Sequence, residues 1–192
     1  LAAACGSLLW CMAPAWGQAL APITITAAAE PEADVRLSAS QGEVRPDATP
    51  HRALSRPAQM LETIPGMVVT QHSGEGKANQ YFLRGMNLDH GTDFATTVNG
   101  VPVNLPTHAH GQGYSDLNFL MPELVSRVDY RKGPYFASAG DFSSAGSADF
   151  AYRPRLDHPL AVWTLGQWGY QRLLVADSRP LAGDVTLLAA LE

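Results

Sequence analysis

Short apolar runs separated by turn residues follow one another between residues 55 and 154. Met60, Leu61 and Ile64 form one apolar stripe, with the spacing of a short amphipathic helix. Ser55 can cap the start of this helix, and the Pro65–Gly66 pair ends it. We therefore expect the ordered part of the chain to begin with a short helix.

The runs that follow this helix have the composition of β-strands. MVVTQ (67–71), YFLR (81–84) and RVDYR (127–131) are rich in β-branched and aromatic residues and lie between polar loops. Asn99–Gly100 separates two further apolar runs, which is the strongest short-range signal for a β-hairpin. The pattern predicts an α+β domain over residues 55–154, with a mixed β-sheet and short helices.

The last segment, residues 155–192, has a different pattern. Alternating residues in LAVWTLGQW place Trp163 on one face of a strand and Thr164 on the other. A turn at SRPLAGD (178–184) leads to VTLLAALE, so the pattern predicts a two-stranded hairpin with aromatic residues near one end. Such a hairpin is typical of the interfacial girdle of a membrane β-barrel. Either it forms a marginal sheet with the preceding domain or, as we expect, the chain is a truncated piece of something larger.

The N-terminal part of the chain predicts export. Residues 1–19 carry no charge and end in the small-residue pattern Gly17-Gln18-Ala19, which is typical of the second half of a cleaved signal peptide. Both cysteines, Cys5 and Cys11, lie in this segment, so the mature chain has no thiol for a disulfide, a nucleophile or a zinc site. Residues 20–54 are rich in Ala, Glu, Pro and Ser, and we expect them to form a flexible tether.

Composition narrows the function classes. The net charge is −5, and charged residues make up 16% of the chain. This composition lacks the basic patch that nucleic-acid binding requires, so we expect no nucleic-acid partner. The low charge, with 17 Gly and 14 Pro, indicates many turns and few exposed helices.

Four blocks in a fixed order carry a family resemblance. LETIPGMVVTQ, YFLRGMN, VNGVPVN and LVSRVDYRKGPYFASAGDFSSAGSADF lie within residues 54–150. In this order they resemble the plug domain of TonB-dependent outer-membrane receptors. The resemblance implies a plug followed by the first strands of a transmembrane β-barrel. It also implies a non-enzymatic receptor in the Gram-negative outer membrane, which imports a scarce ligand such as a ferric siderophore, a metal chelate, haem or cobalamin.

The resemblance also implies roles for particular residues. The isolated β-prone run Ile23, Thr24, Ile25 and Thr26 stands where the family has its TonB box, which the inner-membrane protein TonB engages by strand pairing. Arg84 matches a plug arginine that pairs with barrel glutamates and locks the plug. The second lock position, usually an arginine before Gly-Pro, is Lys132 here, with Arg131 beside it. Because lysine lacks the bidentate fork of arginine, the lock is either weaker or transferred to Arg131.

A Gly- and His-rich stretch between residues 83 and 116 supplies the candidate chemistry. Its candidates for ligand contact are His90, Asp93, His108, His110, Gln112 and Tyr114. Imidazole and carboxylate groups can bind a transition metal, a metal chelate or an anion, and a zinc hydrolase would use similar ligands. The stretch has neither a His-Glu-x-x-His helix nor a Gly-x-Ser-x-Gly elbow, so we expect a gripping or gating surface with no catalytic residues, no bound metal and no cofactor.

Two alternatives remain open beside the transport receptor. One is a periplasmic or secreted plug-like binding module without a barrel, and the other is a periplasmic metal-dependent enzyme built on the histidine loops. A reading frame that continues past Glu192 with many amphipathic strands would favour the receptor.

Overall fold

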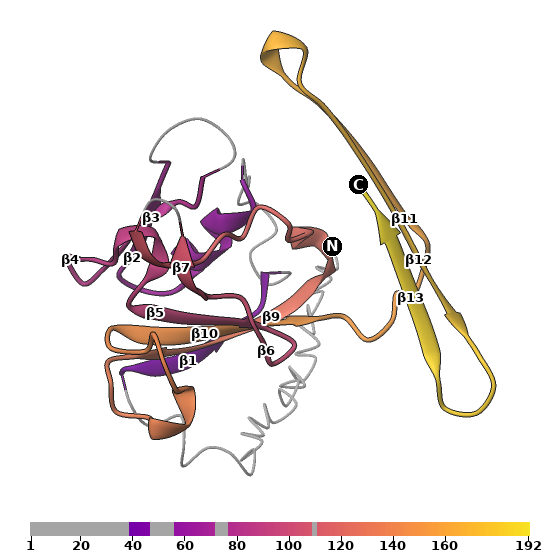
Figure 1. Ribbon diagram of the computed structural model, residues 1–192. Helices are drawn as coiled ribbons and strands as arrows, with labels where there is room; N and C mark the ends of the chain where they lie inside the picture. Colours follow the sequence, from indigo (N-terminus) through magenta and orange to yellow (C-terminus); the bar gives the residue numbers. More distant parts are fainter. Residues whose placement is uncertain (1–38, 47–55, 72–76, 109–110) are drawn as a thin grey trace, which may run out of the picture.

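The computed structural model describes residues 39–46, 56–71, 77–108 and 111–192, and backbone only at 111 and 112. Figure 1 shows a rounded domain and, beside it, a long separate sheet formed by the C-terminal strands. No helix among the described residues is both long and apolar enough to cross a membrane.

A five-stranded mixed sheet forms the base of the domain. Its strands lie in the order β1 (Gln41–Val44), β9 (Val125–Lys132), β10 (Gly146–Tyr152), β5 (Phe94–Val98) and β6 (Val101–Pro102). β10 and β5 run parallel, whereas the other neighbouring pairs are antiparallel. The β5–β6 turn is formed by Asn99 and Gly100 with φ of 50° and 76°, which confirms the predicted hairpin.

Smaller elements cover this sheet. β2 (Met67–Thr70), β3 (Gln80–Leu83) and β4 (Met86–Asn87) form a three-stranded antiparallel sheet, and β7 (Leu105–His108) pairs with β8 (Gly111–Tyr114). The predicted first helix is present as the 3₁₀ helix η3 (Pro57–Thr63), and shorter 3₁₀ turns are η4 (Asp89–Gly91), η5 (Pro122–Leu124) and η6 (Ala137–Ala139).

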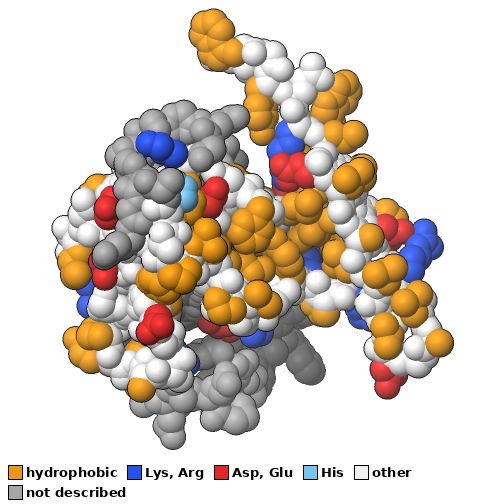
Figure 2. Space-filling model, in the orientation of Figure 1, with side chains coloured by type: hydrophobic (Ala, Val, Ile, Leu, Met, Phe, Trp, Pro, Cys, Tyr) orange, Lys and Arg blue, Asp and Glu red, His pale blue; other side chains and the backbone are white. Residues whose placement is uncertain are grey.

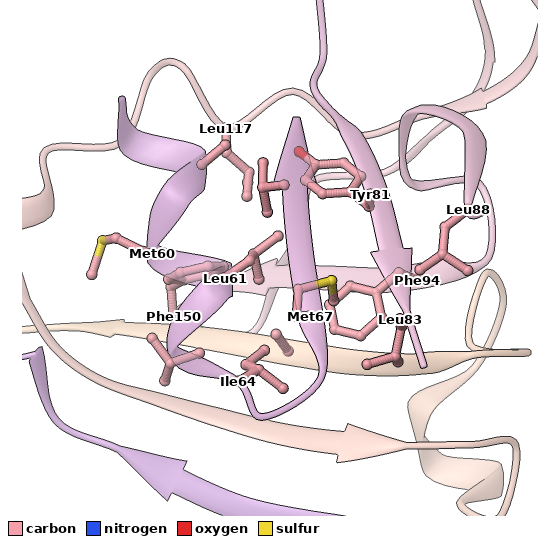
Figure 3. Packing of buried hydrophobic residues seen from close by; sticks show 14 of the residues in the cluster. Met60, Leu61, Ile64, Met67, Tyr81, Leu83, Leu88, Phe94, Leu117 and Phe150 are labelled. Atoms are coloured by element: carbon pink, nitrogen blue, oxygen red, sulfur yellow. The ribbon is translucent and has the colours of Figure 1, made fainter. Parts of the chain in front are cut away.

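The hydrophobic core lies between η3, the β2–β4 sheet and the five-stranded sheet (Figure 3). The predicted stripe supplies Met60, Leu61 and Ile64, all fully buried. Phe94 from β5 and Phe150 from β10 pack against it from the base sheet. The buried residues of these elements thus form one core.

The C-terminal strands form an antiparallel meander of β11 (Leu160–Leu165), β12 (Gln171–Pro180) and β13 (Thr186–Leu191). Large apolar side chains lie exposed along it, and Figure 2 shows hydrophobic atoms along its length. Trp163 on β11 stands directly opposite Leu173 on β12, and Val175 stands opposite Leu191 on β13. Because these positions share one face, this part of the sheet presents an apolar surface to its surroundings, and the Asp177–Arg179 ion pair lies further along the same face of β12.

Two elements differ from the sequence-based expectation. β1 lies inside the stretch 20–54 that composition assigns to a tether, because its pairing with β9, far along the chain, supplies the stabilising contacts. The C-terminal segment has three strands instead of two, since η7 (Gln167–Gly169) turns the chain between β11 and β12. Trp168 adopts φ of 60° in this turn, a conformation that its residue type does not signal.

The α+β class is confirmed: a small domain with a mixed sheet and short helices is followed by antiparallel strands. The helices in the described ranges are all of the 3₁₀ type. Many prolines and glycines interrupt the helical pattern, so regular α-helices do not develop in these ranges.

Candidate functional site

His90 lies inside the domain, in the 3₁₀ turn η4. Its side chain is buried, and its Nδ1 lies 3.2 Å from the backbone oxygen of Ala78. Three consecutive residues, Asp89, His90 and Gly91, have φ of 31°, 60° and 86°. Such left-handed conformations are costly for residues other than glycine and persist only where surrounding contacts hold them. The turn is therefore held by the core around it.

Gly91 is required in this turn for two reasons. Its φ is positive, and a Cβ at this position would lie 2.8 Å from the Cβ of Ser115. The backbone N–H of Ser115 donates to the oxygen of His90 at 2.9 Å, which brings the two segments this close. Any side chain at position 91 would push them apart.

His108 and Tyr114 face each other across the β7–β8 hairpin. Their rings stack with centroids 4.0 Å apart and an interplanar angle of 6°. The Tyr114 hydroxyl accepts the backbone N–H of Ala78 at 2.6 Å, and its ring lies 6.1 Å from that of His90. Three chain segments, at Ala78, His90 and the β7–β8 hairpin, therefore meet at the Tyr114 ring.

Asp93 and Asn104 tie these loops to the base sheet. The Asp93 carboxylate accepts the Ser144 hydroxyl at 2.5 Å, and its backbone oxygen accepts the N–H of Ala145 at 2.9 Å. The Asn104 amide donates to the oxygens of Gly91 and Phe94 at 3.0 Å each. The sequence does not mark Asn104 as a site residue, since a single Asn between two strands has the same pattern as an ordinary turn residue.

The candidates for ligand contact thus differ in their surroundings. His90 is buried and the Asp93 carboxylate is hydrogen-bonded to Ser144, while His108 is half-buried and supported by Tyr114. His110 and the Gln112 side chain lie outside the described part of the chain. No group of three or more His, Cys, Asp or Glu side chains suited to a metal ion exists within the described residues.

The three candidate lock cations do not lie together. Arg131 and Lys132 are neighbours in β9, so their side chains point to opposite faces of the sheet. Arg131 donates to the Ser138 hydroxyl at 3.0 Å and lies 4.8 Å from the centre of the Phe136 ring. Its place is on the face of the sheet that is turned away from the core.

Lys132, the residue at the candidate lock position, lies close to Arg84. The residue is 5% exposed, and Nζ donates to the backbone oxygen of Pro65 at 3.2 Å. Burial lowers the pKa of Lys132, and the nearby positive charge of Arg84 lowers it further. Arg84 is exposed, with φ of 53°, and its Nη2 donates to the Ser40 hydroxyl at 3.3 Å. Arg84, Lys132 and Ser40 form what we call the cation pair site.

The outer face of the base sheet holds a cavity of about 630 Å³. A row of acidic residues crosses it, because Glu43, Asp129 and Asp149 stand opposite one another on β1, β9 and β10. Arg45 binds Glu43 at 2.6 Å and Arg127 binds Asp129 at 2.7 Å. Asp149 accepts the Thr97 hydroxyl and the N–H of Gly100. These partners offset the repulsion between the three neighbouring carboxylates.

Comparison with known families agrees with this architecture. Residues 34–147 match the family model described as TonB-dependent Receptor Plug Domain, which is more than half of the chain. The chain therefore belongs to the TonB-dependent receptor plug-domain family. The match begins before β1, in agreement with the place of that strand in the base sheet.

Solved structures share the fold at low sequence identity. A variant of the ferric enterobactin receptor PfeA of Pseudomonas aeruginosa is 19% identical with a TM-score of 0.62, over 87% of this chain and 26% of that chain. The siderophore receptor PirA of Acinetobacter baumannii is 17% identical with a TM-score of 0.58, over 83% and 25%. The copper transporter OprC is 22% identical with a TM-score of 0.53, over 74% and 22%. The chain thus spans about a quarter of the length of these structures.

Proposed function

We propose that this chain forms the plug and the first membrane strands of an outer-membrane receptor that imports a scarce extracellular ligand. The observation that supports it most directly is the two-sided β11–β13 sheet, which follows the plug fold. Its outward face is apolar around Trp163 and Leu173, which stand side by side, while Arg172 on the other face binds Glu123 of the plug. A strand with lipid on one side and a polar interior on the other has this alternation.

The ligand in this proposal is a ferric siderophore or a related metal chelate. The similar structures are named as receptors for ferric enterobactin or siderophores and as a copper transporter, which supports this class. Haem and cobalamin are kept as members of the same wider class. We assign the contact with the ligand to the β7–β8 hairpin, where His108 rests on Tyr114, together with His110 and Gln112. Anionic chelates accept hydrogen bonds from imidazole, and aromatic rings supply rigid contact area. His90 would support this hairpin through Tyr114 and Ser115, while Asp93 holds the preceding loop to Ser144.

Energy for import would come through TonB. In this proposal the segment Ile23–Thr26 pairs with TonB as a β-strand, after removal of residues 1–19 as a signal peptide. Ser40 connects the chain that follows this segment to the cation pair site, because it receives a hydrogen bond from Arg84 and another from the backbone of Lys132. A pull on the N-terminal segment would therefore act on Ser40 before it acts on the core.

Uptake by living cells tests the proposed function. The complete receptor would be expressed in cells that lack their own siderophore receptors, and uptake of radioactive iron would be measured with a panel of ferric siderophores. We expect uptake of at least one chelate when TonB is present and none when it is absent. Ile25→Pro, which prevents strand pairing, should abolish uptake without changing binding of the chelate to cells. Ala28→Pro, which lies outside the TonB box, should leave uptake unchanged.

A second arm of this experiment tests the ligand contact. His108→Ala should weaken binding of the chelate about tenfold, the effect of losing one good polar or stacking contact. Thr107→Ala, at an exposed position beside it, serves as the matched control. Equal uptake with and without TonB, or no binding of any chelate by intact cells, would contradict the proposal.

A further inference from the structure

β12 has two different faces, and the even-numbered one is turned toward the plug. Leu174 is fully buried, while Leu173 beside it is 57% exposed. Since side chains alternate along a strand, Arg172, Leu174, Ala176 and Ser178 share one face. Figure 1 shows the β11–β13 sheet standing beside the domain, to which it is joined by the segment after β10.

Polar contacts bind both ends of this face to the rest of the chain. Arg172 holds the Glu123 carboxylate with two hydrogen bonds, from Nη1 to Oε1 at 2.5 Å and from Nη2 to Oε2 at 3.0 Å. This bidentate geometry is the strongest arrangement of the two groups. Six residues further on, the Ser178 hydroxyl accepts the N–H of Leu156 and donates to its backbone oxygen.

Glu123 itself is firmly held in the plug. It lies in η5, directly before β9, and the next two residues, Leu124 and Val125, are buried. The backbone oxygen of Leu124 accepts the N–H of Arg153 at 2.8 Å, which joins η5 to the end of β10. A force on Arg172 is therefore transmitted to β9 and β10, two neighbouring interior strands of the base sheet.

β9 separates Glu123 from the cation pair site. Glu123 precedes its first residue and Lys132 is its last, so the two lie roughly 25–30 Å apart along a strand. β1 pairs with the Lys132 half of β9, from Arg131 to Val128, and does not reach the Glu123 end. The chain from the N-terminal segment therefore enters at one end of β9, and Glu123 binds β12 near the other.

We propose that the ion pair of Glu123 and Arg172 is a retaining contact, which keeps the plug attached to the β11–β13 sheet. It is separate from the cation pair site. This proposal rests on the proposed function. The retaining contact holds β9 and β10 in place while the N-terminal segment and β1 are displaced. The plug then opens at the Ser40 end and stays attached at the Glu123 end. Through this contact the plug is attached to β12 of the same chain.

Release of the plug from the complete receptor tests the retaining contact. Purified receptor would be placed in planar lipid bilayers, and the fraction of conducting molecules would be measured as urea is raised. The variants are Glu123→Gln, Arg172→Gln and the double variant. Arg127→Gln is the matched control, because it removes an ion pair with Asp129 at 2.7 Å that lies within β9 and whose two side chains are both exposed. Arg172 also binds the carboxylate of Glu192 at 2.7 Å, and Glu192→Gln measures the contribution of this second pair separately.

The retaining contact predicts a specific pattern. Glu123→Gln and Arg172→Gln should each raise the conducting fraction about tenfold at a given urea concentration below the midpoint, as expected for loss of a charge-assisted pair. The conducting fraction of the double variant should not exceed that of the more severe single variant, because the two substitutions remove the same interaction. Arg127→Gln should behave as the unchanged protein, and Glu192→Gln should have a smaller effect than Glu123→Gln.

Two kinds of failure can be distinguished. Equal conductance of Glu123→Gln and Arg127→Gln, or multiplied effects in the double variant, would overturn the retaining contact and leave the receptor function intact. A receptor that never conducts, even at the highest urea concentration, and whose electrophoretic mobility does not change on heating would overturn both the retaining contact and the proposed receptor function. Heat-dependent mobility also checks that each variant has assembled. Should Arg172→Gln fail this check, Glu123→Asp, which keeps the charge, must retain the plug better than Glu123→Gln.

Discussion

Ser40 and Lys132 are joined through their backbones: the N–H of Lys132 donates to the oxygen of Ser40 at 2.6 Å. The hydroxyl of the same Ser40 accepts Nη2 of Arg84 at 3.3 Å. One residue at the start of the described chain therefore contacts both cations of the cation pair site. Because β1 begins at the next residue, Ser40 is the point at which displacement of the N-terminal segment would first reach this site.

Ser40→Ala tests this coupling. The change removes the hydroxyl acceptor of Arg84 but keeps the backbone contact with Lys132. An exposed hydrogen bond of this kind contributes about 0.5 kcal/mol, which corresponds to about a twofold change in an equilibrium constant. We expect protease to cleave the segment before β1 about twice as fast in outer membranes. Ser138→Ala, which removes the corresponding acceptor of Arg131, is the control and should leave this rate unchanged.

Gly91→Ala should destabilise the domain more than Gly100→Ala. Both glycines have positive φ, 86° and 76°, so alanine carries a conformational penalty of about 1–2 kcal/mol at either position. At Gly91 the new Cβ would also collide with Ser115, whereas at Gly100 nothing lies within 4 Å. Urea unfolding monitored by tryptophan fluorescence should give a larger loss for Gly91→Ala. Equal losses would show that the η4 turn relaxes freely.

Tyr114→Phe should lower the free energy of unfolding by about 1–3 kcal/mol, because it leaves the buried N–H of Ala78 without its acceptor. Tyr81→Phe provides a comparison within the same cluster. The Tyr81 hydroxyl donates to the backbone oxygen of Ser115 at 3.1 Å, and burial raises its pKa, so it remains neutral at physiological pH. Its loss should cost about 1 kcal/mol. Equal free energies of unfolding for the two variants would show that the contact of Tyr114 with Ala78 contributes no more than that of Tyr81 with Ser115.

Acid should weaken the retaining contact. Burial alone would raise the pKa of Glu123, but the hydrogen bonds and charge of Arg172 outweigh it and lower the pKa below its ordinary value of 4.5. A carboxyl whose pKa is lowered on folding binds fewer protons in the folded state, so its stabilisation is present above pH 4.5 and disappears as the pH falls through the folded pKa.

The urea concentration that releases the plug measures this effect. In the unchanged receptor it should decrease as the pH falls below 4.5, and part of that decrease should be missing in Glu123→Gln. Identical pH profiles for the two proteins would mean that Glu123 does not contribute through its charge.

Local signals predict the local parts of this fold. The Asn99–Gly100 hairpin and the apolar stripe of η3 could be predicted because a turn type and a hydrophobic period are properties of neighbouring residues. β1 could not be predicted, since four residues of mixed polarity become a strand through pairing with β9. The η7 turn was missed because tryptophan at position 168 takes a backbone conformation that glycine or asparagine usually marks.

The sequence marks the region of the candidate site but not its internal arrangement. The density of His, Asp and Gly residues marks the stretch 83–116, yet nothing in it indicates that His90 is buried while His108 stacks on Tyr114. The alternation of β9 does predict that Arg131 and Lys132 face opposite ways. Which of them joins Arg84 depends on the position of Pro65 and Ser40, which lie far away in the sequence.

Fractionation of the source cells tests the central claim most directly. An antibody against residues 77–108 would be used on soluble periplasm and outer membranes, with and without boiling of the samples. An outer-membrane band larger than 20.5 kDa whose mobility changes on boiling would agree with a plug inside a closed barrel. A heat-insensitive band near 20.5 kDa in the soluble periplasm would contradict the receptor and favour a plug-like binding module instead.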